Sequence, residues 1–408
     1  MLELPFVKKQ KLNGAVNLPA SKSISHRYLI IQALADAKSI NLQNISNSND
    51  TLVLQKALMH PTSQVDFEDA GTPMRFFLAY AALKDLRVVI SGNASLKQRP
   101  VAPLVDALSQ LGCRIIYLEK EGCLPLSIEK GIDLYCESVT IDSGMSSQFL
   151  SALLLIGPYL NHGLNIISTG ELNSQPYIDL TLDAMRTCGV VVNKESNQYD
   201  VPKSSYTASV PLIVEADWSA AAFVLAWATA RKSKIEIPAL TLESKQGDKV
   251  AKLFYESLGV VINASNLTNG INVISDDLNL PKQIHFDFTH TPDMFPVIAA
   301  TCAYLRIKAH FTGVKNLVLK ESNRIEAMRS NLIQVGANLN SINDNELLMD
   351  FVVPSKDSYA FKSYEDHRIA MACSIFAFEK NITIDNASVV QKSFPNYWHL
   401  FLKMAYES

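Results

Sequence analysis

Residues 101–118 read VAPLVDALSQLGCRIIYL, and this stretch contains the local pattern that decides the fold. Apolar side chains recur at helical spacing up to Leu111, Gly112 follows, and Arg114–Leu118 is rich in residues that favour strands. Glycine is common just past a helix because the backbone there often needs a positive φ. The stretch therefore predicts a helix over Val101–Leu111, a turn at Gly112 and a strand over Arg114–Leu118.

The same pattern occurs four times in the chain. Its glycines are residues 112, 189, 259 and 336, separated by 77, 70 and 77 positions. The other three copies predict helices over Tyr177–Cys188, Lys249–Leu258 and Ile325–Val335. They predict strands over Val190–Asn193, Val260–Asn263 and Asn338–Ile342. Recurrence at a nearly constant distance indicates one repeated supersecondary unit.

A second kind of helix also recurs, and its residues are apolar on nearly all sides, which indicates a buried helix. Six copies begin near Lys22, Thr72, Ser146, Trp218, Asp293 and His367, at spacings of 50, 74, 72, 75 and 74 residues. A strand is predicted after each: Ser39–Ile45, Arg87–Ser91, Leu164–Ser168, Lys234–Ile237, Ile307–Thr312 and Asn381–Ile384.

These patterns predict six α/β units of about 74 residues, three in each of two domains, with a boundary near Glu215–Asp217. The chain of 408 residues exceeds what one hydrophobic core usually holds, which also favours two domains. The first spacing is about 24 residues short, and the loss falls between Asp50 and Asp69. A solenoid is the alternative, but its repeats are usually 20–45 residues long.

Composition and motifs exclude several classes of protein. With 48% hydrophobic and 19% charged residues, the chain is expected to fold, and its net charge of −3 argues against nucleic-acid binding. Its apolar runs are too short to cross a membrane, and the N-terminus lacks a signal-peptide core, so we expect a cytoplasmic protein. Six scattered cysteines without a CxxC pair indicate reduced thiols. Motifs for nucleotides, dinucleotides and metals are missing, so we expect no cofactor and no metal.

Basic and hydroxyl residues gather where the predicted helices begin. Examples are Lys22 and Ser23, Arg99 before Pro100, and Arg368 after Asp366-His367. A cation is electrostatically disfavoured at a helix N-terminus, whereas an anion is favoured there. Taken one at a time, these motifs also fit ordinary caps and solvated helix surfaces. Their equivalent places in the repeat favour a site for a small, multiply anionic molecule.

Nine short motifs resemble those of the 5-enolpyruvylshikimate-3-phosphate synthase family of enolpyruvyl transferases, in the family's order and along the whole chain. They are PASKSISHR (19–27), DAGTPMR (69–75), QRP (98–100), SSQF (146–149), SQPY (174–177), PD (292–293), KESNR (320–324), DHR (366–368) and KSFP (392–395).

The resemblance implies a two-domain α/β fold, an inside-out barrel in which each domain has three βαβαββ units and helix N-termini face an interdomain cleft. In the family, the first strand pairs with the C-terminal half. We therefore expect one discontinuous domain of residues 1–17 and 217–408 and a second domain of residues 18–216, whose first unit is truncated.

The resemblance also implies the reaction. The enolpyruvyl group of phosphoenolpyruvate is transferred to the 5-hydroxyl of 3-phosphoshikimate, and phosphate is released by addition and then elimination. This step leads to chorismate and the aromatic amino acids. It needs no metal or cofactor, and we expect a monomer whose partners are these two small molecules, with no nucleic acid and no membrane.

The resemblance assigns roles by position. The catalytic residues would be Asp293, which accepts the hydroxyl proton, Glu321, which carries the proton of the methyl carbon, and Lys22. The residues that bind 3-phosphoshikimate would be Lys22, Ser23, Arg27, Ser146, Ser147, Gln148, Ser174, Tyr177, Asp293, Asn316 and Lys320. The residues that bind phosphoenolpyruvate would be Lys22, Gly71, Arg99, Gln148, Arg324, Arg368 and Lys392.

Two other functions fit the same fold. A UDP-N-acetylglucosamine enolpyruvyl transferase usually carries a reactive cysteine near the KQRP position, and Ser95-Leu96-Lys97-Gln98 contains none. A non-catalytic protein that binds anions is the third possibility. Asp69 and Pro73 depart from the family's commoner residues, but the motifs that carry the chemistry are retained.

Overall fold

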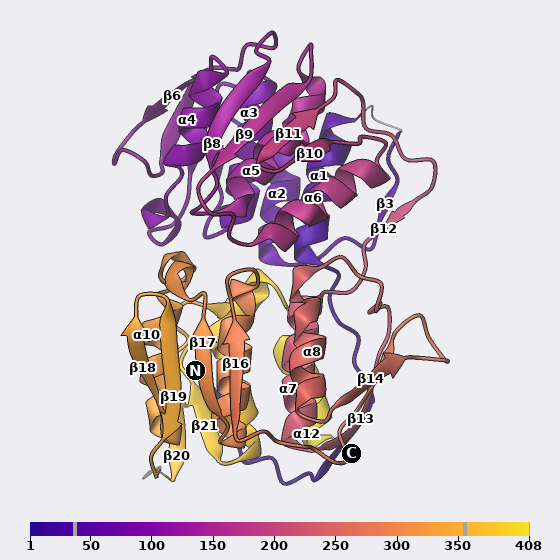
Figure 1. Cartoon of the computed structure of the whole chain (residues 1–408), viewed down its shortest axis with the longest axis vertical. Coiled ribbons are helices and arrows are strands. Elements are labelled where there is room, and N and C mark those ends of the chain that lie inside the picture. The colour runs from indigo at the N-terminus through magenta and orange to yellow at the C-terminus, as the bar shows by residue number, and fades with distance from the viewer. Residues whose placement is uncertain (36–38, 354–356, 408) are drawn as a thin grey trace. The chain divides into compact units, whose positions relative to one another are not determined.

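The computed structural model describes residues 1–35, 39–353 and 357–407. Its contacts divide the chain into two compact units (Figure 1). Unit 1 contains Met1–Pro19 and Glu215–Ser408, and unit 2 contains Ala20–Val214. Each unit has its own hydrophobic core, built mainly from the helices and one face of each sheet.

Four sheets share one strand order: a parallel pair, followed by two strands that pair antiparallel. In unit 2 they are β4-β5-β7-β6 (Gln64–Asp66, Val89–Ser91, Leu126–Lys130, Arg114–Tyr117) and β8-β9-β11-β10 (Ser138–Asp142, Leu164–Thr169, Gln198–Val201, Asn193–Glu195). In unit 1 they are β2-β13-β15-β14 (Lys11–Ala15, Lys232–Ile237, Ile271–Ile274, Val261–Ala264) and β16-β17-β19-β18 (Gln283–Asp287, Lys308–Thr312, Glu346–Phe351, Ala337–Asn343). This common topology confirms the repeated α/β fold.

The remaining two sheets are shorter versions of the same pattern. In unit 2, β12 (Leu212–Ile213) pairs in parallel with β3 (Leu42–Gln43), and within the described residues this sheet has two strands. In unit 1, β20 (Ser358–Phe361) pairs in parallel with β21 (Asn381–Ile384), and β1 (Leu2–Leu4) takes the antiparallel place beside β21. The two-stranded sheet belongs to the first of the six repeats, which the spacing of the helices predicted to be truncated.

Twelve α-helices in two sets pack with these sheets in the described part of the chain. The largely buried set is α1 (Lys22–Leu34), α3 (Gly71–Leu83), α5 (Ser147–Ile156), α7 (Trp218–Ala230), α9 (Phe295–Leu305) and α11 (His367–Cys373). The second set is α2 (Asn49–Met59), α4 (Ala102–Gln110), α6 (Gln175–Thr187), α8 (Val250–Ser257), α10 (Arg324–Leu332) and α12 (Tyr397–Tyr406). The six buried helices begin within two residues of the predicted starts.

The predicted turns are confirmed. Gly112, Gly189, Gly259 and Gly336 have φ values of 84°, 85°, 91° and 78°, so each adopts the conformation in which a Cβ is disfavoured. The strand predicted over Val190–Asn193 is wrong except for its last residue. The Val190 N–H donates to the Met185 carbonyl at 2.9 Å and so belongs to the turn that ends α6, which delays the strand to Asn193.

The N-terminal segment is held in unit 1 by strand pairing and by one arginine. Besides β1 on β21, β2 pairs in parallel with β13. Arg231 donates to the carbonyls of Lys9 (2.9 Å), Val7 (3.1 Å) and Phe378 (2.5 Å), and its guanidinium lies over the Phe378 ring. One side chain therefore bonds two parts of the chain that are distant in sequence.

The strand predicted over Ser39–Ile45 is shorter than expected and contains only Leu42–Gln43. Because β3 has no neighbouring antiparallel strand in the described structure, its pairing ends after two residues.

None of the described helices combines the length and hydropathy that a membrane crossing requires.

Candidate functional site

Lys22 is the first residue of α1 in unit 2, and its ammonium binds a carboxylate. Lys22 Nζ lies 2.8 Å from Asp50 Oδ2, and both side chains are largely buried. Asp50 belongs to the first turn of α2, where the helix dipole favours a negative charge. The carboxylate offsets the unfavourable position of a cation at the start of α1, so this ammonium is fixed by the starts of two helices.

Arg27 bonds α1 to α6. Its Nε donates to Thr181 Oγ1 at 2.8 Å, and its two terminal nitrogens donate to the carbonyls of Ser23 and Tyr177 at 2.7 Å each. Burial lowers the pKa of Arg27 to about 10, which leaves the guanidinium charged at neutral pH. Arg27 therefore positions the first turns that carry Ser23 and Tyr177.

The SSQF motif forms the start of α5. Ser146 is the N-cap and its hydroxyl accepts a bond from the Gln148 N–H at 3.3 Å. Arg75, which is almost fully buried in α3, donates from Nη1 to Gln148 Oε1 at 2.5 Å and from Nη2 to the Pro100 carbonyl at 3.1 Å. Arg75 ends the DAGTPMR motif and had no predicted role of its own, although a cation within the apolar run MRFF is a signal for one.

Gly71 and Arg99 lie in direct contact. Gly71 begins α3, and a Cβ built on it would be 2.6 Å from Arg99 Nη1 and 2.8 Å from Arg99 Cζ. The missing side chain thus leaves room for a guanidinium at the first turn of the helix.

Ser174, the residue before α6, has φ 63° and ψ 38°, and its carbonyl accepts from the Tyr177 N–H at 3.0 Å.

In unit 1, Arg324 contacts three carboxylates. Its side chain is 1% exposed, and its Nε, Nη1 and Nη2 lie 2.8, 2.7 and 2.8 Å from Asp366, Asp293 and Glu321 respectively. Burial disfavours the charge, but the three carboxylates outweigh it and hold the pKa of Arg324 well above its ordinary value. This arrangement fixes the guanidinium as a permanent cation at the start of α10.

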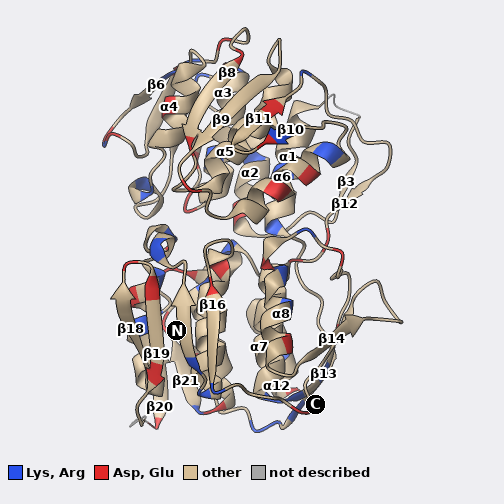
Figure 2. Ribbon diagram, in the orientation of Figure 1, with Lys and Arg blue, Asp and Glu red and all other residues tan. Residues whose placement is uncertain are grey.

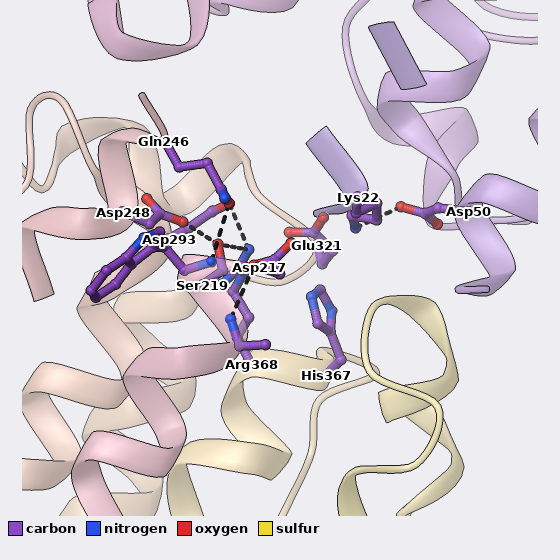
Figure 3. A network of polar contacts seen from close by, with 12 residues as sticks. Lys22, Asp50, Asp217, Ser219, Gln246, Asp248, Asp293, Glu321, His367 and Arg368 are labelled. Atoms are coloured by element: carbon purple, nitrogen blue, oxygen red, sulfur yellow. Dashed lines mark hydrogen bonds and ion pairs between the residues drawn. The ribbon is translucent and has the colours of Figure 1, made fainter. Parts of the chain in front are cut away.

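Asp293 bridges two arginines, and Figure 3 shows its side with Arg368. Its Oδ1 accepts from Arg324 Nη1 at 2.7 Å, and its Oδ2 accepts from Arg368 Nη2 at 2.9 Å. Burial opposes ionisation of Asp293, yet Arg368 and Arg324 hold its pKa well below the usual range. As the network stands here, Asp293 is a stably ionised carboxylate.

Asp366 fixes the position of both arginines. Its Oδ1 accepts from the Arg368 N–H at 2.9 Å as the N-cap of α11, and its Oδ2 accepts from Arg324 and from the Ser322 hydroxyl. Asp366 belongs to the DHR motif, but its bond to Arg324 joins residues 42 positions apart and has no local signal in the sequence. In Figure 2, basic and acidic segments lie together at the N-terminal ends of α7 and α8 in the same unit.

The other predicted residues of unit 1 lie at the starts or ends of short helical turns. Asn316 is in η5 (Lys315–Leu319), which Lys320 and Glu321 follow, and buried Lys392 ends η8 (Ser388–Lys392). The structure brings Asp293, Glu321, Arg324 and Arg368 into one network. Asn316 and Lys392 lie on other segments of the same unit, η5 and η8. No group of histidine, cysteine and acidic residues suited to a metal occurs in the described ranges.

Comparison with known proteins identifies relatives along nearly the whole chain. The family model described as EPSP synthase (3-phosphoshikimate 1-carboxyvinyltransferase) matches residues 7–60 and 53–401. A 3-phosphoshikimate 1-carboxyvinyltransferase of Bacteroides fragilis is 38% identical over 395 residues, which covers 95% of this chain and 94% of that protein. One of Vibrio cholerae serotype O1 is 32% identical over 424 residues and covers 97% of each chain.

Solved structures share the fold. An EPSP synthase from Acinetobacter baumannii superposes with a TM-score of 0.78 at 21% identity and covers 99% of this chain and 98% of its own. The enolpyruvyl transferase NikO from Streptomyces tendae superposes with a TM-score of 0.71 at 13% identity, over 98% and 97% of the two chains. The α/β architecture is therefore that of the enolpyruvyl transferases.

Proposed function

Because this chain belongs to the EPSP synthase (3-phosphoshikimate 1-carboxyvinyltransferase) family, we propose that it transfers the enolpyruvyl group of phosphoenolpyruvate to 3-phosphoshikimate in the shikimate pathway. The products are 5-enolpyruvylshikimate 3-phosphate and phosphate. The observation that carries the proposal, beside the family, is the pair of guanidiniums that meet at Asp293.

The reaction needs two proton transfers at carbon and one at oxygen. In the addition, the 5-hydroxyl oxygen bonds to C2 of phosphoenolpyruvate, its proton leaves to a base, and C3 receives a proton from an acid. In the elimination, C2 loses phosphate and the new methyl group returns a proton, which restores the double bond. Asp293 is the proposed base for the hydroxyl, and Glu321 and Lys22 are the proposed carriers of the carbon-bound proton.

Arg324 and Arg368 are the proposed ligands of phosphoenolpyruvate in unit 1, together with Lys392. Planar guanidiniums bind carboxylates and phosphates through paired N–H groups. Both arginines are bonded to Asp293 here, at 2.7 and 2.9 Å. An incoming anion that shares their positive charge raises the pKa of Asp293 and so makes this carboxylate a better proton acceptor at the step that needs one.

Residues of unit 2 are the proposed ligands of 3-phosphoshikimate. Ser146, Ser147 and Gln148 stand at the start of α5, where hydroxyls and free N–H groups favour a phosphate. Arg75 holds the Gln148 side chain, and Arg27 holds the turns of Ser23 and Tyr177. We propose that Arg27 contributes to the binding of 3-phosphoshikimate in two ways: it positions Ser23 and Tyr177, and its positive charge attracts the anion. Lys22 and Ser174 of unit 2, with Asp293, Asn316 and Lys320 of unit 1, complete the proposed set.

Also in unit 2, Gly71, Arg99 and Gln148 are proposed to bind phosphoenolpyruvate. The close contact of Gly71 with Arg99 supports this assignment, because a side chain at residue 71 would displace the guanidinium. The monomeric state and the cytoplasmic location remain predictions, and neither is needed for the proposed chemistry.

Phosphate release in a coupled assay tests the proposal. We expect phosphate only when 3-phosphoshikimate and phosphoenolpyruvate are both present. Release with UDP-N-acetylglucosamine in place of 3-phosphoshikimate would instead indicate the other enolpyruvyl transferase activity. Ligand-induced stabilisation in a thermal-shift titration, without turnover, would indicate a binding protein.

A further inference from the structure

Asp248 is a buried carboxylate that the proposed reaction does not use. It lies in η3 (Gly247–Lys249), directly before α8, and is 3% exposed. A buried charge is costly unless other groups compensate for it. The groups around Asp248 therefore indicate what it does.

Asp248 is bonded to the Asp293 network through one hydroxyl group (Figure 3). The Ser219 hydroxyl, in the first turn of α7, donates to Asp248 Oδ2 and accepts from Arg368 Nη2 at 3.4 Å. Arg368 Nη2 also donates to Asp293 Oδ2 at 2.9 Å. Two carboxylates thus act on the same guanidinium, Asp293 directly and Asp248 through Ser219.

Some of the groups around Asp248 raise its pKa and others lower it. Burial, followed by the negative charge of Asp293, raises the pKa of Asp248 to about 6, and Asp217 acts in the same direction. Arg368 and the Ser219 bond act against this rise. Arg368 is therefore the cation that stabilises the ionised form of this carboxylate.

Neighbouring residues hold this arrangement in place. Asp217 caps α7 by accepting from the Ala220 N–H at 3.0 Å, and Gln246 accepts from the Trp218 N–H at 3.1 Å. Gln246 also donates to the Glu215 carboxylate at 2.7 Å and to the Ala216 carbonyl at 2.8 Å. The starts of α7 and η3 are fastened together, which fixes Ser219 relative to Asp248.

We propose that Asp248 is a positioning residue that, through Ser219, orients Arg368 and offsets part of its positive charge. This inference rests on the proposed function, because Arg368 is taken as a ligand of phosphoenolpyruvate. The negative charge of Asp248 would weaken the binding of that anion to Arg368. As a like charge near Asp293, it would also make Asp293 a stronger base than it would be without Asp248. The residue would thus favour turnover over tight binding.

Asp248→Asn tests the proposal, because it removes the charge and retains the shape. We expect KM for phosphoenolpyruvate to fall about three- to tenfold, kcat to fall by a similar factor, and the acid limb of the kcat profile to move to lower pH. A merely structural role predicts the opposite change in KM. A KM that rises or stays unchanged would overturn the proposal.

Ser219→Ala removes the connecting hydroxyl and provides a second variant if Asp248→Asn does not fold. It is expected to lower KM in the same direction but by less, because the charge of Asp248 remains, and the double variant is expected to resemble Asp248→Asn. Additive effects would overturn the proposal. Asp287→Asn is the matched control, since it removes an exposed aspartate that bonds Thr312 in the same unit and should leave KM unchanged.

The two proposals fail differently. Absence of turnover in the wild-type protein with both substrates would refute the proposed function. A titration with phosphoenolpyruvate alone, followed by thermal shift, still tests Asp248. The Asp248→Asn protein should then have the lower apparent Kd, and an equal or higher Kd would overturn this inference.

Discussion

Arg324 Nε donates to Asp366 Oδ2 across 2.8 Å, and neither side chain is more than 1% exposed. The other carboxylate oxygen of Asp366 caps α11. One aspartate therefore fixes the first residue of α10 and the first turn of α11, which carry the two guanidiniums of the network.

Asp366→Ala is expected to lower the free energy of unfolding by about 3–5 kcal/mol, because it leaves a buried guanidinium with one carboxylate fewer and removes a helix cap. Denaturant unfolding measures this loss. Asp366→Asn retains an oxygen for the cap and should cost less than the alanine variant. An alanine variant within about 1 kcal/mol of wild type would contradict the structural role.

Asp293→Asn is expected to reduce kcat by at least about a hundredfold while 3-phosphoshikimate still binds, because an amide cannot accept the hydroxyl proton. Steady-state kinetics and a binding titration measure the two effects separately. Asp287→Asn serves as the control with an exposed aspartate. A kcat close to that of wild type would refute the role of Asp293 as base.

The same variant has a predicted pH signature. Burial opposes ionisation of Asp293, but the two arginines hold its folded-state pKa well below the unfolded value of about 3.9. Its stabilising effect is therefore complete above the unfolded pKa and is lost as the pH falls through the folded one. The difference in free energy of unfolding between wild type and Asp293→Asn should stay constant near neutral pH and shrink below about pH 4.

Gly71→Ala is expected to raise KM for phosphoenolpyruvate by about tenfold or more with little loss of stability. The new methyl group would lie 2.6 Å from Arg99 Nη1, and the end of a flexible side chain moves more readily than the backbone. Gly157→Ala is the control, since its methyl group would crowd Val201 at 2.9 Å and should affect stability rather than KM. An unchanged KM for Gly71→Ala would count against the assignment of Arg99.

Arg231→Met is expected to lower the free energy of unfolding by about 2–4 kcal/mol, because the partly buried carbonyls of Val7, Lys9 and Phe378 lose their donor. Chemical denaturation provides the measurement. Lys232→Met, which replaces the exposed neighbour, is the matched control and should be close to neutral. Equal effects of the two substitutions would show that Arg231 does not fasten the N-terminal segment.

Local signals explain why much of the fold was predictable. The glycines after α4 and α6 have positive φ, as their place after a helix predicted. Such a helix end depends on a few neighbouring residues, so it can be recognised in the sequence without knowledge of the tertiary structure. The wrong strand prediction at Val190–Asn193 also came from a local signal. Three valines favour a strand, but the helix-ending bond of Val190 to Met185 decides the local backbone.

The candidate site was predictable only in part. Positions such as Lys22 and Arg368 stand out because a cation at a helix start is unusual. Their partners do not, since Asp50 lies 28 residues from Lys22 and Asp366 lies 42 residues from Arg324. Tertiary packing determines those pairs. Arg75 belongs to the DAGTPMR motif, but its bond to Gln148 was not predictable because its neighbours in the helix are apolar.

The pairing of β1 with β21 has a consequence for synthesis on the ribosome. Unit 2 is made of one continuous stretch, so it can fold as soon as residues 20–214 have left the exit tunnel. Leu2–Leu4 must remain unpaired until Asn381–Ile384, far along the chain, have been synthesised. Unit 1 can therefore complete the sheet of β1, β21 and β20 only after Asn381–Ile384 have left the ribosome, and until then the pairing edge of β1 stays open.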